Sequence, residues 1–149
     1  MTDLGSVDPA KMSGLEFLRY ATSLPDRTGI GSLLGIAADV LEEGHVIMSL
    51  EPRPEFANPL GTVHGGIFST LLDSAMGCAV HTTLPAGAGY TTLGLTVNLV
   101  RAVPVDAERL IAEGTTVHVG GRTATAEGQV KDADGRLVAH ATTNCMIFR

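Results

Sequence analysis

The segment from Gly65 to Leu84 constrains the fold more than any other part of this chain. Apolar residues repeat at helical spacing on two of its faces, one through Ile67 and Leu71 and the other through Phe68 and Leu72. A helix that is apolar on more than one face has to be buried. The sequence therefore predicts one long helix inside the molecule, closed by Pro85 because proline interrupts a helix.

Strand-forming sequence dominates the rest of the chain after Gly89. The segments are rich in Val, Thr, Ile and Leu, which favour strands, and two of the links, Gly120-Gly121 and Asp132–Gly135, are typical of hairpins. The four predicted strands are Thr91–Val103, Arg109–Val119, Thr123–Lys131 and Leu137–Phe148. This pattern predicts an antiparallel sheet that needs cover on one face.

Two shorter features precede the long helix. Ser13 followed by Glu16 predicts a capped helix at about 13–24, and a strand pair is expected at Ile36–Leu41 and His45–Glu51, joined at Glu43-Gly44. The fold class is therefore α+β, with a long antiparallel sheet covered by one apolar helix. We expect a single domain over residues 1–149.

Composition excludes several classes of protein. Of the 149 residues 44% are hydrophobic, which is too many for a disordered chain, and the net charge of −6 with no Trp argues against a nucleic-acid binder. The first residues are too charged for a secretory signal, and no segment reads as a membrane span. Cys78 and Cys145 form no CxxC pair, so we expect reduced thiols in a cytoplasmic protein without a metal site.

The segment with the clearest chemistry begins at Asn58 and continues through His64-Gly65-Gly66 to Asp73. The two glycines lie at the expected start of the long helix, where backbone N–H groups lack helical partners and carry the positive end of the helix dipole. Such groups can stabilise a developing oxyanion. Asp73 is unusual on an apolar helix, because buried acids are rare unless they are paired or functional.

Helix geometry limits how these groups can cooperate. Asp73 follows Gly66 by seven residues, so the two lie on one helix face about 10 Å apart. A carboxylate at that distance cannot reach a carbonyl held at the Gly66 amide of the same chain, since reacting atoms approach to about 3–3.5 Å. If both groups act on one bond, a two-fold dimer with antiparallel helices would supply Asp73 from the partner subunit.

Each of these residues also has a purely structural interpretation. Asp73 could cap or pair with a neighbour at a subunit interface, and His64 could bond a backbone carbonyl in a turn. The two glycines could serve helix packing alone. Asn58 could start an Asn-Pro turn.

Taken together, the segment resembles the hotdog-fold acyl-CoA thioesterases, and most closely their phenylacetate-degradation (PaaI-like) branch. The resemblance rests on the spacing of Asn58, His64-Gly65-Gly66 and Asp73, and it extends through Leu71–Gly77 and Thr91–Val103 to cover about residues 34–148. It implies a sheet wrapped around the helix and hydrolysis of an acyl-CoA to a free acid and CoA. It also implies a homodimer, with a dimer of dimers common in the family, and no cofactor.

The resemblance also implies roles for individual residues. The Gly66 amide would polarise the thioester carbonyl, Asp73 would act as general base or nucleophile, and His64 and Asn58 would orient the thioester or water. The family's water-positioning Ser or Thr corresponds most closely to Gly94 here, and Thr91 or Thr92 could substitute for it. Gly65 would contribute to substrate binding, and Arg101 and Arg122 could contact CoA phosphates.

Two other functions remain open from the sequence. The same fold could dehydrate or hydrate an acyl thioester, or it could bind acyl-CoA as a sensor without catalysis. Free thiol released from acyl-CoA would distinguish the hydrolase from both. No nucleic-acid or membrane partner is expected.

Overall fold

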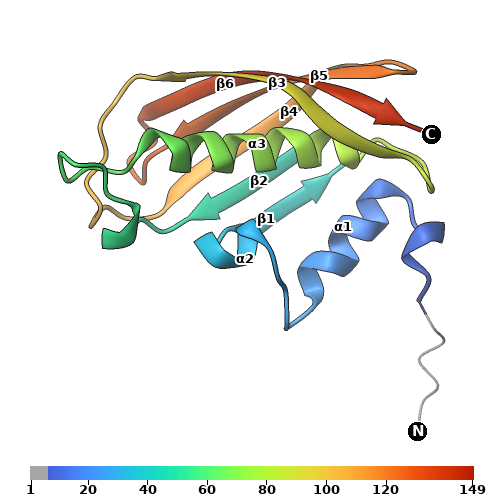
Figure 1. The fold of residues 1–149 in the computed structure, drawn as a ribbon, viewed down its shortest axis with the longest axis horizontal. Coiled ribbons are helices and arrows are strands. Elements are labelled where there is room, and N and C mark those ends of the chain that lie inside the picture. Colours follow the sequence, from blue (N-terminus) through green and yellow to red (C-terminus); the bar gives the residue numbers. More distant parts are fainter. Residues whose placement is uncertain (1–6) are drawn as a thin grey trace, which may run out of the picture.

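The computed structural model describes residues 7–149. Its long helix, α3 (Gly65–His81), lies across a six-stranded antiparallel sheet in the order β1-β2-β4-β5-β6-β3 (Figure 1). The strands are β1 (Ala37–Glu42), β2 (His45–Leu50), β3 (Gly89–Leu99), β4 (Leu110–Val119), β5 (Thr123–Lys131) and β6 (Leu137–Phe148). The α+β class and the wrapped sheet expected from the sequence are confirmed.

Burial of α3 explains why the sheet curves around it. Leu71, Leu72, Ala75 and Met76 are all 0% exposed, and they pack against the inward-facing residues of the strands, such as Val46. Burying each such leucine contributes about 1.5–3 kcal/mol. The core therefore forms between one helix and one face of the sheet, as its two apolar stripes predict.

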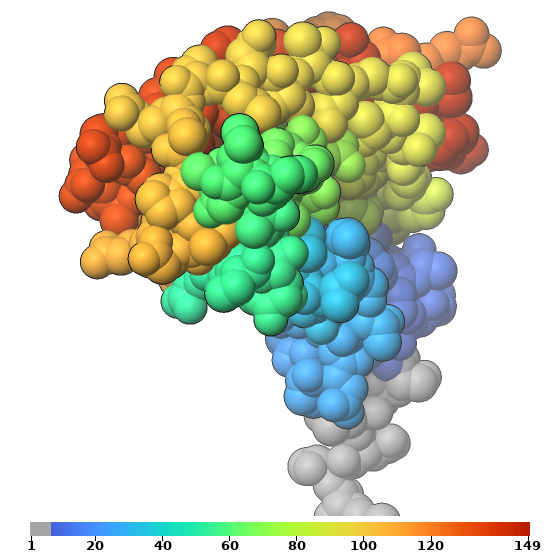
Figure 2. Space-filling view, turned by 60° about the vertical axis from the view of Figure 1, so that its left-hand side comes forward, coloured from blue at the N-terminus to red at the C-terminus, as the bar shows by residue number. Residues whose placement is uncertain are grey.

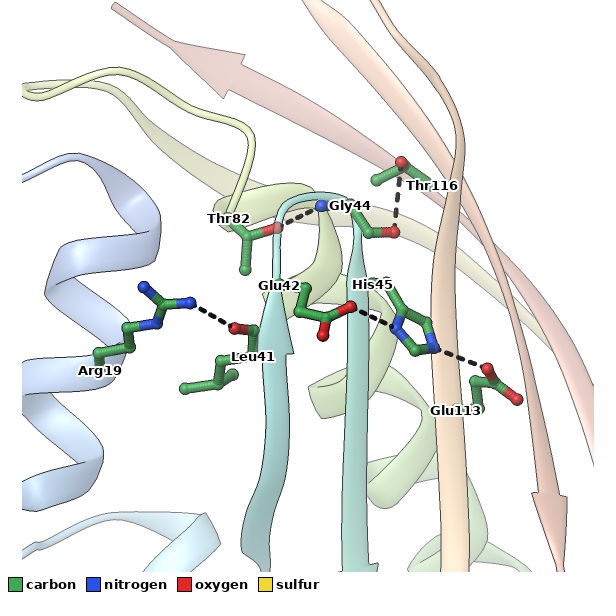
Figure 3. Close-up of polar contacts among 8 residues, drawn as sticks. All are labelled: Arg19, Leu41, Glu42, Gly44, His45, Thr82, Glu113 and Thr116. Atoms are coloured by element: carbon green, nitrogen blue, oxygen red, sulfur yellow. Dashed lines mark hydrogen bonds and ion pairs between the residues drawn. The ribbon is translucent and has the colours of Figure 1, made fainter.

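The turn between β1 and β2 ties three elements together (Figure 3). The Gly44 N–H donates to Thr82 Oγ1 at 2.8 Å. The Gly44 carbonyl accepts from the Thr116 N–H at 3.0 Å and from Thr116 Oγ1 at 3.5 Å, and the second of these is the contact drawn in Figure 3. Thr82 is the C-cap of α3, so the helix ends at His81 and not at the predicted Leu84. A side-chain contact from a distant turn fixes this end, which a local pattern does not reveal.

Smaller elements fill the N-terminal part. Helix α1 (Gly14–Ser23) carries the predicted capping box, with Ser13 Oγ accepting from the Glu16 N–H and Glu16 Oε2 accepting from the Ser13 N–H. Sequence analysis misses α2 (Ile30–Leu34), because five residues are too few to show a helical period. Short 3-10 turns occur at η1 (Pro9–Lys11) and η2 (Pro54–Phe56). Across residues 7–149, every helix is too short or too polar to span a membrane.

The two edge strands differ in how they are covered. Along β1, the Arg19 guanidinium of α1 donates to the Leu41 carbonyl at 3.0 Å (Figure 3). Strand β3, at the other edge, begins at Gly89 and ends at Leu99, before the predicted Val103, and its Leu93 and Leu99 are 57% and 52% exposed. The sheet thus has one edge covered by its own chain and one edge that carries exposed apolar side chains.

Candidate active site

The start of α3 presents backbone N–H groups beside a histidine. His64 is the N-cap of α3, and its Nδ1 accepts a hydrogen bond of 2.9 Å from the Gly66 N–H. Because a backbone N–H is always the donor, this bond places the proton of the neutral imidazole on Nε2. The Nε2–H is therefore the ring's remaining donor.

This hydrogen bond means that the Gly66 N–H already has a partner within the chain. The sequence predicts an amide open to a ligand, whereas in the described chain the Gly66 N–H is held by the residue two positions earlier. Gly66 itself is exposed, so a ligand oxygen can approach this amide from solvent. A carbonyl oxygen can thus take the place of His64 Nδ1 if the ring turns away.

Asp73 lies on the side of α3 that faces the edge strand β3. Its Oδ1 accepts a hydrogen bond of 2.8 Å from Thr92 Oγ1. Of the three positions considered on this strand, Thr92 alone makes this contact: Thr91 is exposed on the opposite side, and an added Cβ at Gly94 would meet nothing within 4 Å. A bulge between Thr92 and Gly94 shifts the strand's alternation at this point.

Beyond Asp73, the next turn of α3 receives an aromatic ring from β3. A Cβ at Gly77 would lie 2.6 Å from the Tyr90 hydroxyl, so only glycine leaves room for this ring. Burial raises the pKa of Tyr90, and the nearby Cys78 and Asp73 add to the shift. Burial likewise raises the pKa of the Cys78 thiol to about 11, with a further contribution from Asp73. Asp73 is therefore bordered by a neutral phenol and a neutral thiol.

Sequence analysis does not identify Tyr90 as a neighbour of the site. One signal was available, because Tyr90 and Thr92 are two residues apart on a strand and so share a face. Asp73 and Gly77 share a helix face in the same way, four residues apart. Thr92 therefore contacts Asp73, and Tyr90 contacts Gly77 one helical turn further along α3.

Asn58 is engaged within its own loop. Its Oδ1 accepts from the N–H groups of Leu60 and Thr62 at 2.9 and 3.2 Å, and its Nδ2 donates to Thr62 Oγ1 at 2.9 Å. These bonds are those of an Asx turn, and they shape the loop that leads to His64. They support the structural interpretation of Asn58 without testing a role in binding.

The two arginines considered for phosphate binding lie far apart. Arg101 borders a hollow of about 330 Å³ at the start of α3, together with Asn58, Gly65 and Leu99. Arg122 precedes β5 at the other end of the sheet, where its carbonyl accepts from the Ile147 N–H. One chain therefore brings Arg101, but not Arg122, to the glycines of α3.

Metal-ligating groups do not gather anywhere in residues 7–149, where no cluster of three His, Cys, Asp or Glu side chains could hold an ion. The described site consists of a helix-start amide with its histidine, and of a carboxylate with its threonine on the same helix. Together such groups can serve acyl transfer to water, the N–H donor by polarising a carbonyl and the carboxylate by acting as a base or nucleophile.

Comparison with known proteins agrees with this chemistry. Residues 60–139 match the model of the thioesterase superfamily. A Halobacterium salinarum protein named provisionally as an esterase is 32% identical over 138 residues, which cover 85% of this chain and 89% of the relative.

Solved structures show the same fold. A Haemophilus influenzae thioesterase superposes with a TM-score of 0.79 at 19% identity, covering 91% of this chain and 90% of that one. A Ralstonia eutropha protein, named provisionally as a thioesterase and as related to phenylacetic acid degradation, superposes with a TM-score of 0.78 at 27% identity, covering 87% of this chain and 98% of that one. The resemblance to PaaI-like hotdog proteins is thereby confirmed, and the chain belongs to the thioesterase superfamily as a hotdog-fold thioester hydrolase.

Proposed function

We propose that this enzyme hydrolyses an acyl-CoA to a carboxylic acid and CoA, with Gly66 of one subunit and Asp73 of another acting on the same thioester. One observation carries the proposal: Asp73, hydrogen-bonded by Thr92 Oγ1, stands about 10 Å along α3 from the Gly66 amide and beside the open edge of the sheet. The Asp73 carboxylate is therefore too far to act on a carbonyl bound at Gly66 of its own chain, and it is well placed to act on a carbonyl bound at Gly66 of a partner subunit.

The open edge favours pairing through β3. An unpaired edge strand offers free N–H and C=O groups that a second strand can bond, and the exposed Leu93 and Leu99 would be covered by such pairing. A two-fold axis there aligns the two α3 helices antiparallel. Each Asp73 would then lie near the glycines of the partner's helix. Further pairing of such dimers into a tetramer belongs to the same proposal.

In this mechanism the substrate carbonyl replaces His64 Nδ1 on the Gly66 N–H. The helix dipole and this amide then stabilise the negative charge that develops on the oxygen. The freed imidazole donates its Nε2–H toward the thioester sulfur. Asp73, oriented by Thr92, either takes a proton from the water that attacks the carbonyl carbon, or attacks that carbon itself and forms an anhydride that water then hydrolyses. In both routes the carbon–sulfur bond breaks, and CoA leaves as a thiolate that takes up the proton released from water.

Arg101 is the candidate contact for the CoA phosphates, because it borders the hollow beside Gly65. Arg122 lies at the opposite end of its own sheet, so it could reach the same CoA only from the partner subunit. Guanidinium groups suit this purpose, since their planar N–H donors match phosphate oxygens.

The direct test compares the wild type with Asp73→Asn for free-thiol release from a panel of acyl-CoAs, aromatic through long-chain. Asparagine keeps the size and the bond from Thr92 but cannot act as base or nucleophile. We expect turnover to fall by roughly two to four orders of magnitude, with the melting temperature and oligomeric state unchanged. Full turnover in the variant would remove Asp73 from the mechanism.

Mixing two inactive variants tests the contribution of two subunits to each site. Gly66→Pro removes the N–H, and proline is tolerated in the first turn of a helix. Random 1:1 pairing of Gly66→Pro with Asp73→Asn subunits makes half of the dimers mixed, each with one intact site, and should restore about a quarter of the wild-type activity. If each site came from a single chain, no activity would return.

A further inference from the structure

A second hollow lies near the opposite edge of the sheet from Asp73, where α2, the end of β2 and the start of β4 meet. It has a volume of about 340 Å³ and is bordered by Leu34, Ser49, Glu51, Arg53 and Arg109, among others. That size falls at the lower end of the range for small-molecule sites, roughly 300–1,000 Å³. Figure 2 shows the blue α2 segment, the green loop after β2 and the yellow-orange connection before β4 together on one face.

Ser49 is the first unusual feature of this hollow. It pairs with Ala37 of β1 and Ile111 of β4, so its side chain points to the sheet face away from α3, the face where most residues are exposed. Ser49 is nevertheless 1% exposed. Its Oγ has no hydrogen-bond partner within the described chain.

The second unusual feature is Arg53. Its Nη2 donates to the Leu33 carbonyl at 2.7 Å and its guanidinium lies 4.5 Å from the centre of the Phe56 ring, so the group is held in place. Its Nε is buried and lacks a hydrogen-bond partner. Among residues 7–149, Ser49 Oγ and Arg53 Nε are the two buried side-chain polar atoms in this condition, and both residues border the same hollow.

A buried donor without a partner is costly, and more so when it is charged. A free N–H of a guanidinium and a hydroxyl both suit an oxygen acceptor, and Arg109 adds a second guanidinium at the rim. We propose that this hollow binds a small molecule through one oxyanion group, a carboxylate or a single phosphate, held by Ser49, Arg53 and Arg109. The site does not depend on the thioesterase mechanism.

Acidic neighbours restrict the ligand's charge. Asp39 lies 3.7 Å from Arg109 Nη1 and Glu55 lies 3.9 Å from Arg53 Nε. Both distances exceed that of a hydrogen bond, so these N–H groups remain free to donate. The two carboxylates, with Glu51 at the rim, disfavour a polyphosphate and favour a ligand that carries one oxyanion group.

The site can be tested by NMR on ¹⁵N-labelled protein, because the Nε–H of Arg53 has its own signal. Titration with sodium phosphate, and separately with sodium acetate, should shift that signal saturably for at least one anion. The more effective anion identifies the preferred oxyanion. A CoA arm serves as the comparison, and a shift given by CoA but by neither anion would overturn the proposal.

Variants separate this site from unspecific charge effects. Ser49→Ala and Arg109→Gln should each weaken binding of the effective anion by about tenfold, as expected for loss of one hydrogen bond to a charged group. Arg149→Gln is the matched control, because Arg149 donates to the Gly121 carbonyl beyond the far end of β4, and its loss should leave the affinity unchanged.

Two results would overturn the proposal. The first is that neither anion gives a saturable shift, which would mean that water alone satisfies both atoms. The second is that binding persists unchanged in both Ser49→Ala and Arg109→Gln. Both variants are expected to fold, because alanine fits the space of serine and Arg109 is half exposed.

Discussion

At the scale of single residues, the site depends on a side-chain bond that the sequence does not specify. The motif from His64 to Asp73 could be found from its spacing together with the resemblance to the thioesterases, and helix geometry fixes how far Gly66 lies from Asp73. The resemblance offers Gly94, Thr91 or Thr92 on the following strand and does not choose among them, because the bulge after Thr92 interrupts the strand's alternation. The bond between His64 Nδ1 and the Gly66 N–H depends on a side-chain rotamer, which a sequence pattern does not determine.

The Thr92 contact predicts a positioning effect on catalysis. In Thr92→Val the shape is kept and the bond to Asp73 Oδ1 is lost, so the carboxylate is less well oriented. We expect kcat to fall about tenfold, the equivalent of one hydrogen bond to a charged group, while KM changes little. The control is Thr91→Val, next to it but exposed on the other side, and an equal loss there would contradict a specific role.

Two buried hydroxyls predict opposite effects on stability. Thr82 Oγ1 accepts from the Gly44 N–H and donates to the Ala79 carbonyl, so Thr82→Val should cost about 1–3 kcal/mol by leaving a buried N–H unpaired. Ser49 Oγ has no such partners, so Ser49→Ala should leave the free energy of unfolding equal or higher. Urea unfolding of both variants, without added anions, measures the difference.

At the scale of elements, long periodic segments were predictable and short or contact-dependent ones were not. Helix α3 and the strands follow from two apolar stripes and from β-branched runs. The end of α3 at His81 follows instead from the bond between Thr82 and Gly44, which are distant in the sequence. The five residues of α2 lie between Gly29 and Gly35 and are too few to show a helical period.

The junction of β1, β2 and β4 predicts a pH effect on stability. His45 Nε2 lies 2.7 Å from Glu113 Oε1 and its Nδ1 lies 3.5 Å from Glu42 Oε2 (Figure 3). The hydrogen bond to Glu113 is the main cause that raises the pKa of His45 above its usual value, with Glu42 contributing further.

Because the raised pKa belongs to the folded protein, the contribution of the His45 ion pairs to the free energy of unfolding is fully present below the ordinary histidine pKa of 6.5. That contribution is lost as the pH rises through the raised value. We expect His45→Gln to cost about 1 kcal/mol or less at pH 5.5, as for other exposed ion pairs, and almost nothing at pH 8.5. Urea unfolding at both pH values tests this, and Glu113→Gln should reproduce most of the effect. A cost that grows with pH would contradict the assignment.

At the scale of the whole molecule, the two sheet edges determine how copies can associate. The exposed Leu93 of β3 predicts that Leu93→Lys weakens the proposed dimer, because a lysine on an edge strand opposes pairing. We expect a smaller particle by light scattering and a parallel loss of thiol release. Val117→Lys is the control for an exposed apolar residue, 61% exposed on the central strand β4, and it should leave the β3 pairing intact. A fully active Leu93→Lys monomer would contradict the shared site.

The hydrogen bond from Arg19 to the Leu41 carbonyl has a consequence for growth of the assembly. A sheet with two open edges can add copies at both ends without limit, as amyloid-like chains do. With α1 packed beside β1, each copy has one open edge, so in the proposed pairing through β3 the addition of strands would stop at two copies. Helix α1 would then allow an exposed apolar edge to persist without polymerisation.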